Sequence, residues 1–137
     1  MGNPAGVPQT PPDGAADVIP FVRAWVDAYA FTQVIEVPIW AYALRVHRRG
    51  PQRWPVSTCA VVGFGASAIT HPFVWFVFPY AVRDYWTMVI LAEAFAVGVE
   101  AAYTGLLGLR RAILWSLVAN GTSVLLGFAS RALFEWP

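Results

Sequence analysis

Lysine is absent from the 137-residue chain, cysteine occurs once, and charged residues make up only 12% of the sequence. The single cysteine, Cys59, excludes an intrachain disulfide bond and cannot form a zinc site by itself. The net charge of +1 gives no electrostatic basis for binding nucleic acid. Because 58% of the residues are hydrophobic, a soluble domain of this size could not bury its apolar surface, and a disordered chain is also excluded. The composition therefore predicts an integral membrane protein, with the lipid bilayer as its partner.

Sequence motifs of the common catalytic sites are also missing. The chain contains no G-x-S-x-G, no H-E-x-x-H and no Walker A sequence. The G-x-G-x-S stretch at 63–67 lacks the context of a phosphate-binding loop, so we interpret it as a helix-packing stripe. Ser67 and His71 share one helix face and could pair, but no third group or oxyanion donor accompanies them. An intramembrane enzyme is therefore the least favoured class of function.

The beginning of the chain has the composition of a flexible segment. Residues 1–20 hold five of the eleven prolines and contain no apolar run. We expect residues 1–22 to form a disordered tail rather than a secretory signal.

Four apolar segments follow, at about 26–44, 56–82, 85–109 and 112–130. Each is close to or longer than the ~20 residues that a helix needs to cross a bilayer. Their short connections favour antiparallel neighbours. The sequence thus predicts an all-α polytopic membrane protein, with residues 23–137 forming an up-down bundle of four transmembrane helices. The second segment contains Pro72 and Pro79, and we expect a kink, tilt or break near residues 70–72.

The arginines predict the orientation of this bundle. The first and third loops carry six of them: Arg45, Arg48, Arg49, Arg53, Arg110 and Arg111. The opposite side has three, Arg23, Arg83 and Arg131. Loops rich in arginine face the cytoplasm, so we expect both termini outside, in a bacterial inner (plasma) membrane.

Polar and ionisable side chains interrupt all four apolar segments. Charges at the bilayer centre cost several kcal/mol, so such residues often mark a functional site. The candidates are Gln33, Glu36, His71, Glu93, Glu100 and Asn120. At a rise of about 1.5 Å per residue, we expect an outer layer of Glu93, His71, Gln33 and, nearer the middle, Glu36. We expect Glu100 and Asn120 to form an inner layer.

Two interpretations of these residues stay open. Hydrogen bonds between Asn, Ser, His and protonated Glu side chains can simply hold helices together. Three glutamates are harder to explain in this way, because a neutral Gln or Ser would pack without any charge to bury. Carboxyl and imidazole groups also suit a proton relay or a divalent metal, although the spacing matches no known metal signature. The sequence therefore leaves any metal or cofactor undetermined.

The leading hypothesis is a small membrane protein whose midplane polar site binds or transports a proton, a cation or a small cationic ligand. A chain of this size has little room to form a transport pathway by itself, so a homodimer or a larger membrane complex is expected. The alternative is a membrane-embedded subunit or scaffold whose polar groups bind the helices of a partner.

Overall fold

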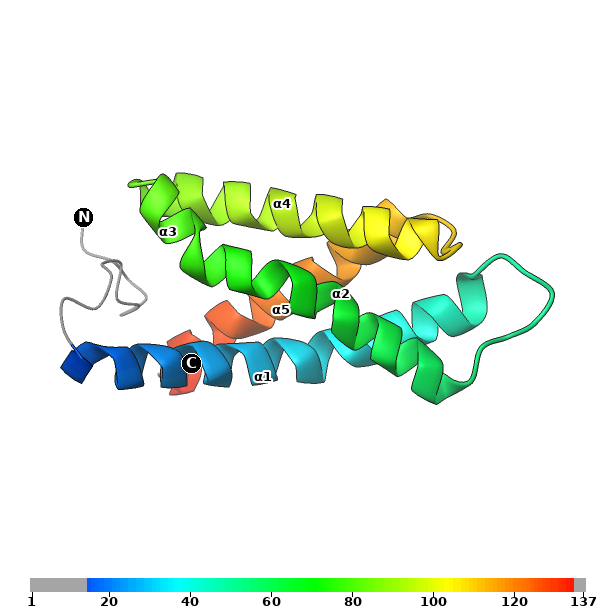
Figure 1. The fold of residues 1–137 in the computed structure, drawn as a ribbon, viewed down its shortest axis with the longest axis horizontal. Helices are drawn as coiled ribbons and strands as arrows, with labels where there is room; N and C mark the ends of the chain where they lie inside the picture. The colour runs from blue at the N-terminus through cyan, green and yellow to red at the C-terminus, as the bar shows by residue number, and fades with distance from the viewer. Residues whose placement is uncertain (1–14, 135–137) are drawn as a thin grey trace.

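The computed structural model describes residues 15–134, which are almost entirely helical. The elements are α1 (Ala15–His47), α2 (Val56–Phe76), α3 (Phe78–Ala81), α4 (Tyr85–Leu106) and α5 (Ala112–Phe134). The four long helices run alternately up and down along the long axis of the molecule (Figure 1). The expected all-α fold is confirmed within this part of the chain, where no strand occurs.

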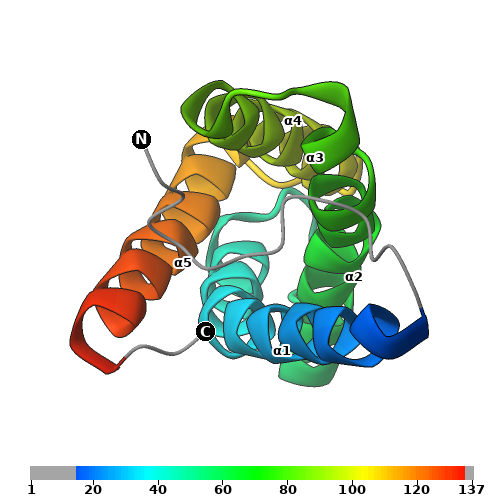
Figure 2. The same cartoon turned by 90° about the vertical axis from the view of Figure 1, so that its left-hand side faces the viewer.

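The long helices form a ring when the bundle is viewed from its end (Figure 2). Both α1 and α4 pack against α2 and against α5. Within residues 15–134, the backbone of α1 does not pack against that of α4, nor the backbone of α2 against that of α5. Each diagonal pair therefore faces across the interior, where side chains from all four helices can meet.

The first helix begins earlier than the sequence indicated. α1 starts at Ala15 and includes Pro20, so residues 15–22, which were expected in the tail, are helical. Tertiary packing explains this start, because the buried ring of Phe21 lies 6.0 Å from the ring of Trp75 and 5.7 Å from that of Phe76. The rest of the expected tail, residues 1–14, lies outside the described residues.

The second apolar segment is interrupted at Val77, while residues 70–72, where a kink, tilt or break was expected, lie inside α2. The helix continues through Pro72 to Phe76, and Val77 follows it with φ −120° and ψ −53°. Pro79 has no N–H to continue the hydrogen-bonding ladder, and it stands in the first turn of α3, where none is needed. The break therefore lies just before the second proline of this segment, Pro79.

The two arginine-rich loops meet at one end of the bundle, as the four-segment interpretation requires. The Arg49 N–H donates to Gly108 O at 2.8 Å, and the Arg110 N–H donates to His47 O at 3.1 Å. α4 ends at Leu106, before the expected residue 109, because the chain turns through Gly108 at φ +91°. α1 and α5 each extend a few residues past their apolar segments.

Three helical segments are long and apolar enough to cross a membrane: Val56–Ala81, Tyr85–Leu106 and Ala112–Phe134. Among the described residues α1 is not one of them, since its polar residues lower its mean hydropathy. Large apolar side chains point outward along the bundle, including Val34, Val61, Ile90 and Leu125. The buried positions between the helices are instead rich in small and polar residues. This inverted distribution is compatible with an integral membrane protein.

Candidate functional site

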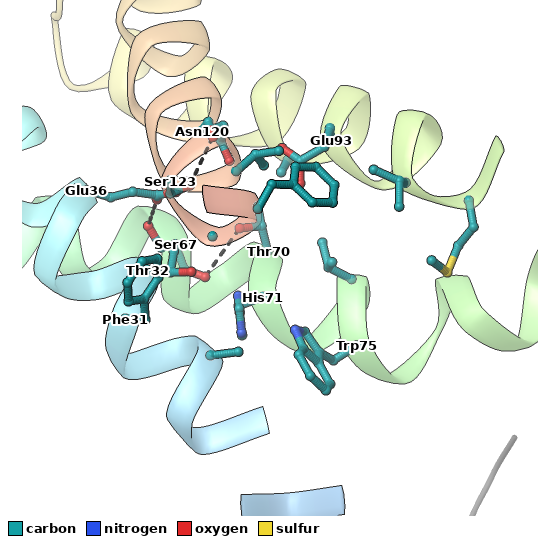
Figure 3. Close-up of a pocket in the computed structure, with 18 of the residues that line it drawn as sticks. Phe31, Thr32, Glu36, Ser67, Thr70, His71, Trp75, Glu93, Asn120 and Ser123 are labelled. Carbon is teal, nitrogen blue, oxygen red and sulfur yellow. Dashed lines mark hydrogen bonds between the residues drawn. The ribbon is translucent and has the colours of Figure 1, made fainter. Parts of the chain in front are cut away.

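Two buried carboxyl groups lie at the centre of the bundle, one from α1 and one from α4. Glu36 and Glu100 each keep only 1% of their surface exposed. The Ser67 hydroxyl donates to Glu36 Oε2, and the Ser123 hydroxyl donates to Glu36 Oε1 at 2.6 Å (Figure 3). Both oxygens of this carboxyl group therefore have a partner, which a buried charge requires.

Glu100 is bound in the same manner by the same two neighbouring helices. The Thr70 hydroxyl donates to Glu100 Oε1 at 2.8 Å, and Asn120 Nδ2 donates to Glu100 Oε2 at 2.6 Å. We call this set of side chains the carboxyl layer; it consists of Glu36, Ser67, Thr70, Glu100, Asn120 and Ser123. Ser67 and Thr70 are three residues apart on α2, as are Asn120 and Ser123 on α5, so each helix supplies one partner to each glutamate.

The carboxyl layer can satisfy Glu100 with or without its proton. Asn120 Nδ2 also donates to the Ser116 carbonyl at 3.0 Å, which fixes the amide as a donor and leaves Glu100 Oε2 as an acceptor. Thr70 Oγ1 lies 2.8 Å from Glu100 Oε1 and 3.2 Å from Ser67 O, but it has only one proton. When Glu100 is ionised, the Thr70 hydroxyl donates its hydrogen bond to Glu100 Oε1. When Glu100 is protonated, its carboxylic acid donates to Thr70 Oγ1, and the Thr70 hydroxyl donates to the Ser67 carbonyl instead.

Glu36 has an equivalent arrangement on α5. Ser123 Oγ lies within hydrogen-bonding distance of both Glu36 Oε1 and Asn120 O, the latter at 3.0 Å. When Glu36 is ionised, the Ser123 hydroxyl can donate to Glu36 Oε1. When Glu36 is protonated and donates to Ser123 Oγ, the Ser123 hydroxyl can donate to the Asn120 carbonyl instead. Neither protonation state of these glutamates leaves a buried polar atom unsatisfied at these hydroxyls.

A cavity of about 230 Å³ extends from the carboxyl layer toward the end of the bundle opposite the arginine loops. Glu36, Glu100 and Asn120 form its floor, and the side chains of Pro79 and Arg131 line its rim. Between them the walls include Phe21, Phe31, Trp75, Tyr85, Phe128, His71 and Glu93. On the other side of the layer, a cluster of buried residues fills the bundle: Trp40, Ala43, Leu44, Cys59, Ala66, Leu109 and Ala119. The cavity is therefore a blind pocket rather than a channel through the bundle.

His71 lies in the wall of this cavity with an unused nitrogen. The residue is 9% exposed, and its buried Nε2 has no hydrogen-bond partner among residues 15–134. Its ring lies 5.0 Å from that of Tyr29 and 6.1 Å from that of Trp75 (Figure 3 labels His71 and Trp75). The Ser67 hydroxyl binds Glu36 instead, so the pairing of Ser67 with His71 that the sequence allowed does not occur.

Glu93 lies on the cavity-facing side of α4, two helical turns from Glu100 toward the rim of the cavity. Val89, Glu93, Ala96 and Glu100 recur at spacings of four, three and four and all line the cavity. Glu36, Glu93 and Glu100 all line this one cavity. No hydrogen bond to the Glu93 side chain occurs within residues 15–134, so its carboxyl oxygens can accept hydrogen bonds from a ligand.

The structure brings most of the sequence candidates together, in a different grouping from the one expected. Glu100 and Asn120 are in direct contact, but Glu36 joins their layer rather than that of Glu93. Gln33 does not line the cavity; its Nε2 donates to Phe64 O at 3.5 Å, and its Oε1 has no partner among the described residues. Sequence reasoning missed Thr70 as a partner of Glu100, although its spacing of three from Ser67 repeats the spacing of Asn120 and Ser123.

The residues do not support a metal centre. Within residues 15–134, no group of three or more His, Cys, Asp or Glu side chains is arranged to hold a metal ion. Comparison of the chain with protein-family models, with characterised proteins and with solved structures finds no match. The chemistry that these side chains can perform is proton exchange and the binding of a positively charged group.

Proposed function

We propose that the chain is an integral membrane protein of four spanning helices that binds a proton and a small organic ammonium ion in its cavity. α1 would be the fourth span despite its lower hydropathy, because its most polar central residues, Gln33 and Glu36, are buried inside the bundle. The arginine loops would face the cytoplasm and the cavity the outside.

The observation that carries this proposal is that three glutamates line one cavity. Apart from His71, the only basic side chain in the described lining is Arg131, at the rim. Charges that are taken out of water need a partner of opposite sign or a proton. A bound cation or a bound proton would each meet this need, and the two would compete for the same carboxyl groups.

The unused polar groups and the aromatic walls favour an ammonium ion with an apolar body. Glu93 would accept hydrogen bonds from the ammonium group, and His71 Nε2 would contact a further polar group of the ligand. Phe31, Trp75 and Phe128 would contact the apolar part and attract the positive charge through their ring faces. The carboxyl layer below, whose hydrogen bonds are already satisfied, would hold or release the proton that the cation displaces.

Benzylammonium is a suitable probe, with benzyl alcohol as its neutral counterpart. We expect the protein purified in mild detergent to bind benzylammonium, with a change in tryptophan fluorescence and a release of protons into weakly buffered solution. Glu93→Gln should weaken the binding by at least about tenfold, which corresponds to the loss of one charge-assisted contact of ~1.5 kcal/mol or more. Asp27→Asn is the matched control, because Asp27 lies on α1 outside the cavity lining.

Glu36→Gln and Glu100→Gln would test the carboxyl layer separately. We expect both variants to fold and to release fewer protons when benzylammonium binds. Unchanged binding and unchanged proton release in all three Glu→Gln variants would contradict the proposal.

A second candidate function is that of a membrane-embedded subunit. Ala94, Gly98 and Ala102 form an exposed stripe of small residues on α4, in an outer groove that also includes Ile113 and Leu117 of α5. Such stripes allow close approach of another helix. A Cβ at Gly98 would meet no atom within 4 Å, so Gly98→Leu should leave the monomer intact and block a partner at this groove. A monodisperse monomer of the unchanged protein in mild detergent would count against this function.

A further inference from the structure

The end of the bundle opposite the cavity carries an uncompensated positive charge. The two loops there contain Arg45, Arg48, Arg49, Arg53, Arg110 and Arg111. No acidic residue occurs in residues 37–83 or 101–134, which include both loops and the helix ends around them. Any charge compensation at this end must therefore come from outside these segments.

Arg48 joins the two loops through contacts of its side chain. Its Nε donates to Leu107 O at 3.1 Å and its Nη1 to Gln52 O at 3.3 Å. Its guanidinium carbon lies 3.8 Å from the centre of the Trp54 ring. Together with the backbone pairing of Arg48 and Leu109, these contacts hold the loops in a fixed relative position.

The two loops form a pocket whose lining includes Arg48 and two further arginines. The pocket, of about 310 Å³, is lined by Val46, His47, Arg48, Arg110 and Arg111. The side chains of Arg110 and Arg111 have no hydrogen bond or ion pair within residues 15–134. His47 is held beside them by its ring contact with Trp115, at 5.2 Å.

We propose that this arginine pocket binds a phosphate-bearing anion. Guanidinium groups bind phosphate oxygens through paired hydrogen bonds, and the positive charge of two of them complements the negative charge of one phosphate group. The source of the phosphate is either the headgroup of an anionic phospholipid or a free phosphate. Leu106 and Ile113, which flank the turn in the sequence, are 90% and 66% exposed, and they offer an apolar surface for lipid chains.

This site is independent of the function proposed for the cavity, since it lies at the other end of the bundle and shares no lining residue with it. The test uses the full chain in mild detergent, with two probes in separate arms. One probe is phosphatidylglycerol, compared with phosphatidylcholine and measured by native mass spectrometry. The other is inorganic phosphate, compared with chloride at equal ionic strength and measured by thermal unfolding.

We expect the unchanged protein to bind phosphatidylglycerol, inorganic phosphate or both. The double variant R110Q/R111Q should bind roughly 30-fold more weakly, as expected for the loss of two arginines beside an anionic surface. R23Q/R83Q removes two charges from the other end and should bind as the unchanged protein does. R110K/R111K keeps the charges that the loops carry and should bind with intermediate affinity, because lysine cannot form the paired contacts.

Each outcome decides the question. Binding of phosphatidylglycerol alone identifies a lipid site, and binding of inorganic phosphate in micelles free of anionic lipid identifies a site for a soluble anion. The proposal is overturned if neither probe binds the unchanged protein, or if R110Q/R111Q and R23Q/R83Q weaken binding equally.

Discussion

Glu36 and Glu100 belong to helices whose backbones do not pack against each other within residues 15–134, yet both carboxyl groups are bound by the same two helices, α2 and α5. The pairs on α2 and α5 each have a spacing of three residues, which places their two polar groups on one side of the helix. Any rotation of α2 or α5 would therefore disturb both glutamates together. The two carboxyl groups are therefore linked through the side chains of α2 and α5.

The Thr70 hydroxyl should stabilise the bundle through Glu100. Thr70→Val keeps the shape of the side chain but removes the hydrogen bond to Glu100 Oε1. We expect a loss of about 0.6–2 kcal/mol in the free energy of unfolding, the range for hydrogen bonds between helices in membranes. Thr70→Ser keeps the hydroxyl and should lose less. Equal stability of the Val and Ser variants in thermal unfolding would show that this hydrogen bond contributes nothing.

The contact between α1 and α2 depends on Gly63. A Cβ at this position would lie 2.6 Å from Trp40 Cβ, which belongs to the rigid stem of a fully buried side chain. Gly63→Ala should therefore force the two helices apart and destabilise the protein by about 1–3 kcal/mol.

Gly121 provides the matched control for Gly63. A Cβ there would meet nothing within 4 Å, so Gly121→Ala should be neutral or stabilising by up to about 1 kcal/mol. Thermal unfolding of both variants under the same conditions checks the pair. A destabilisation of similar size in both would mean that the close approach at Trp40 is not the cause.

Asp84 should make the start of α4 sensitive to acid. Its Oδ2 accepts hydrogen bonds from the Thr87 N–H at 2.8 Å and the Thr87 hydroxyl at 2.7 Å, and these hold the pKa of Asp84 below its ordinary value. Since the folded pKa is the lower one, the contribution to stability is complete above the ordinary pKa of about 4. It is lost as the pH falls through the folded value.

Asp84→Asn keeps an oxygen that can cap the helix but removes the titrating group. The difference in stability between the unchanged protein and this variant should therefore shrink as the pH falls below about 4. A difference that stays constant down to the lowest pH at which the protein folds would contradict this assignment.

The orientation of the bundle can be tested with the single native cysteine in place. Cys59 is 0% exposed and should not react with a membrane-impermeant maleimide. Gln52→Cys, in the first arginine loop, should react only after the cells are permeabilised. Ala81→Cys, at the end of α3, should react on intact cells, because the segment Val56–Ala81 separates the two positions. Labelling of both positions from the same side would exclude a membrane span between them.

The sequence predicted the helices better than their ends. Apolar length and short connections located α2, α4 and α5, but the start of α1 depends on the packing of Phe21 against Trp75 and Phe76, which local composition does not reveal. A kink, tilt or break was expected near residues 70–72, and the helix is interrupted at Val77, before Pro79. Either proline allows an interruption, so the sequence pattern does not fix its position.

The sequence indicated which polar residues lie inside the bundle better than it indicated which of them contact one another. Gln33 was grouped with Glu36 by its depth in the membrane, but at a spacing of three residues their directions on a helix differ by about 60°. That angle turns Gln33 toward Phe64 and away from the cavity. The shared partners of Glu36 and Glu100 arise from the relative rotation of α2 and α5, which one sequence does not fix.

The blind end of the cavity has a consequence for how the site would sense voltage. Trp40 and Leu44 fill the bundle on the arginine side of the carboxyl layer, so a charge that enters from the rim stops at Glu36 or Glu100. Moving one elementary charge across a whole membrane is worth about 2.3 kcal/mol per 100 mV. In a spanning bundle, a charge that stops part of the way across would take up part of that energy, and the occupancy of the glutamates would follow the membrane potential.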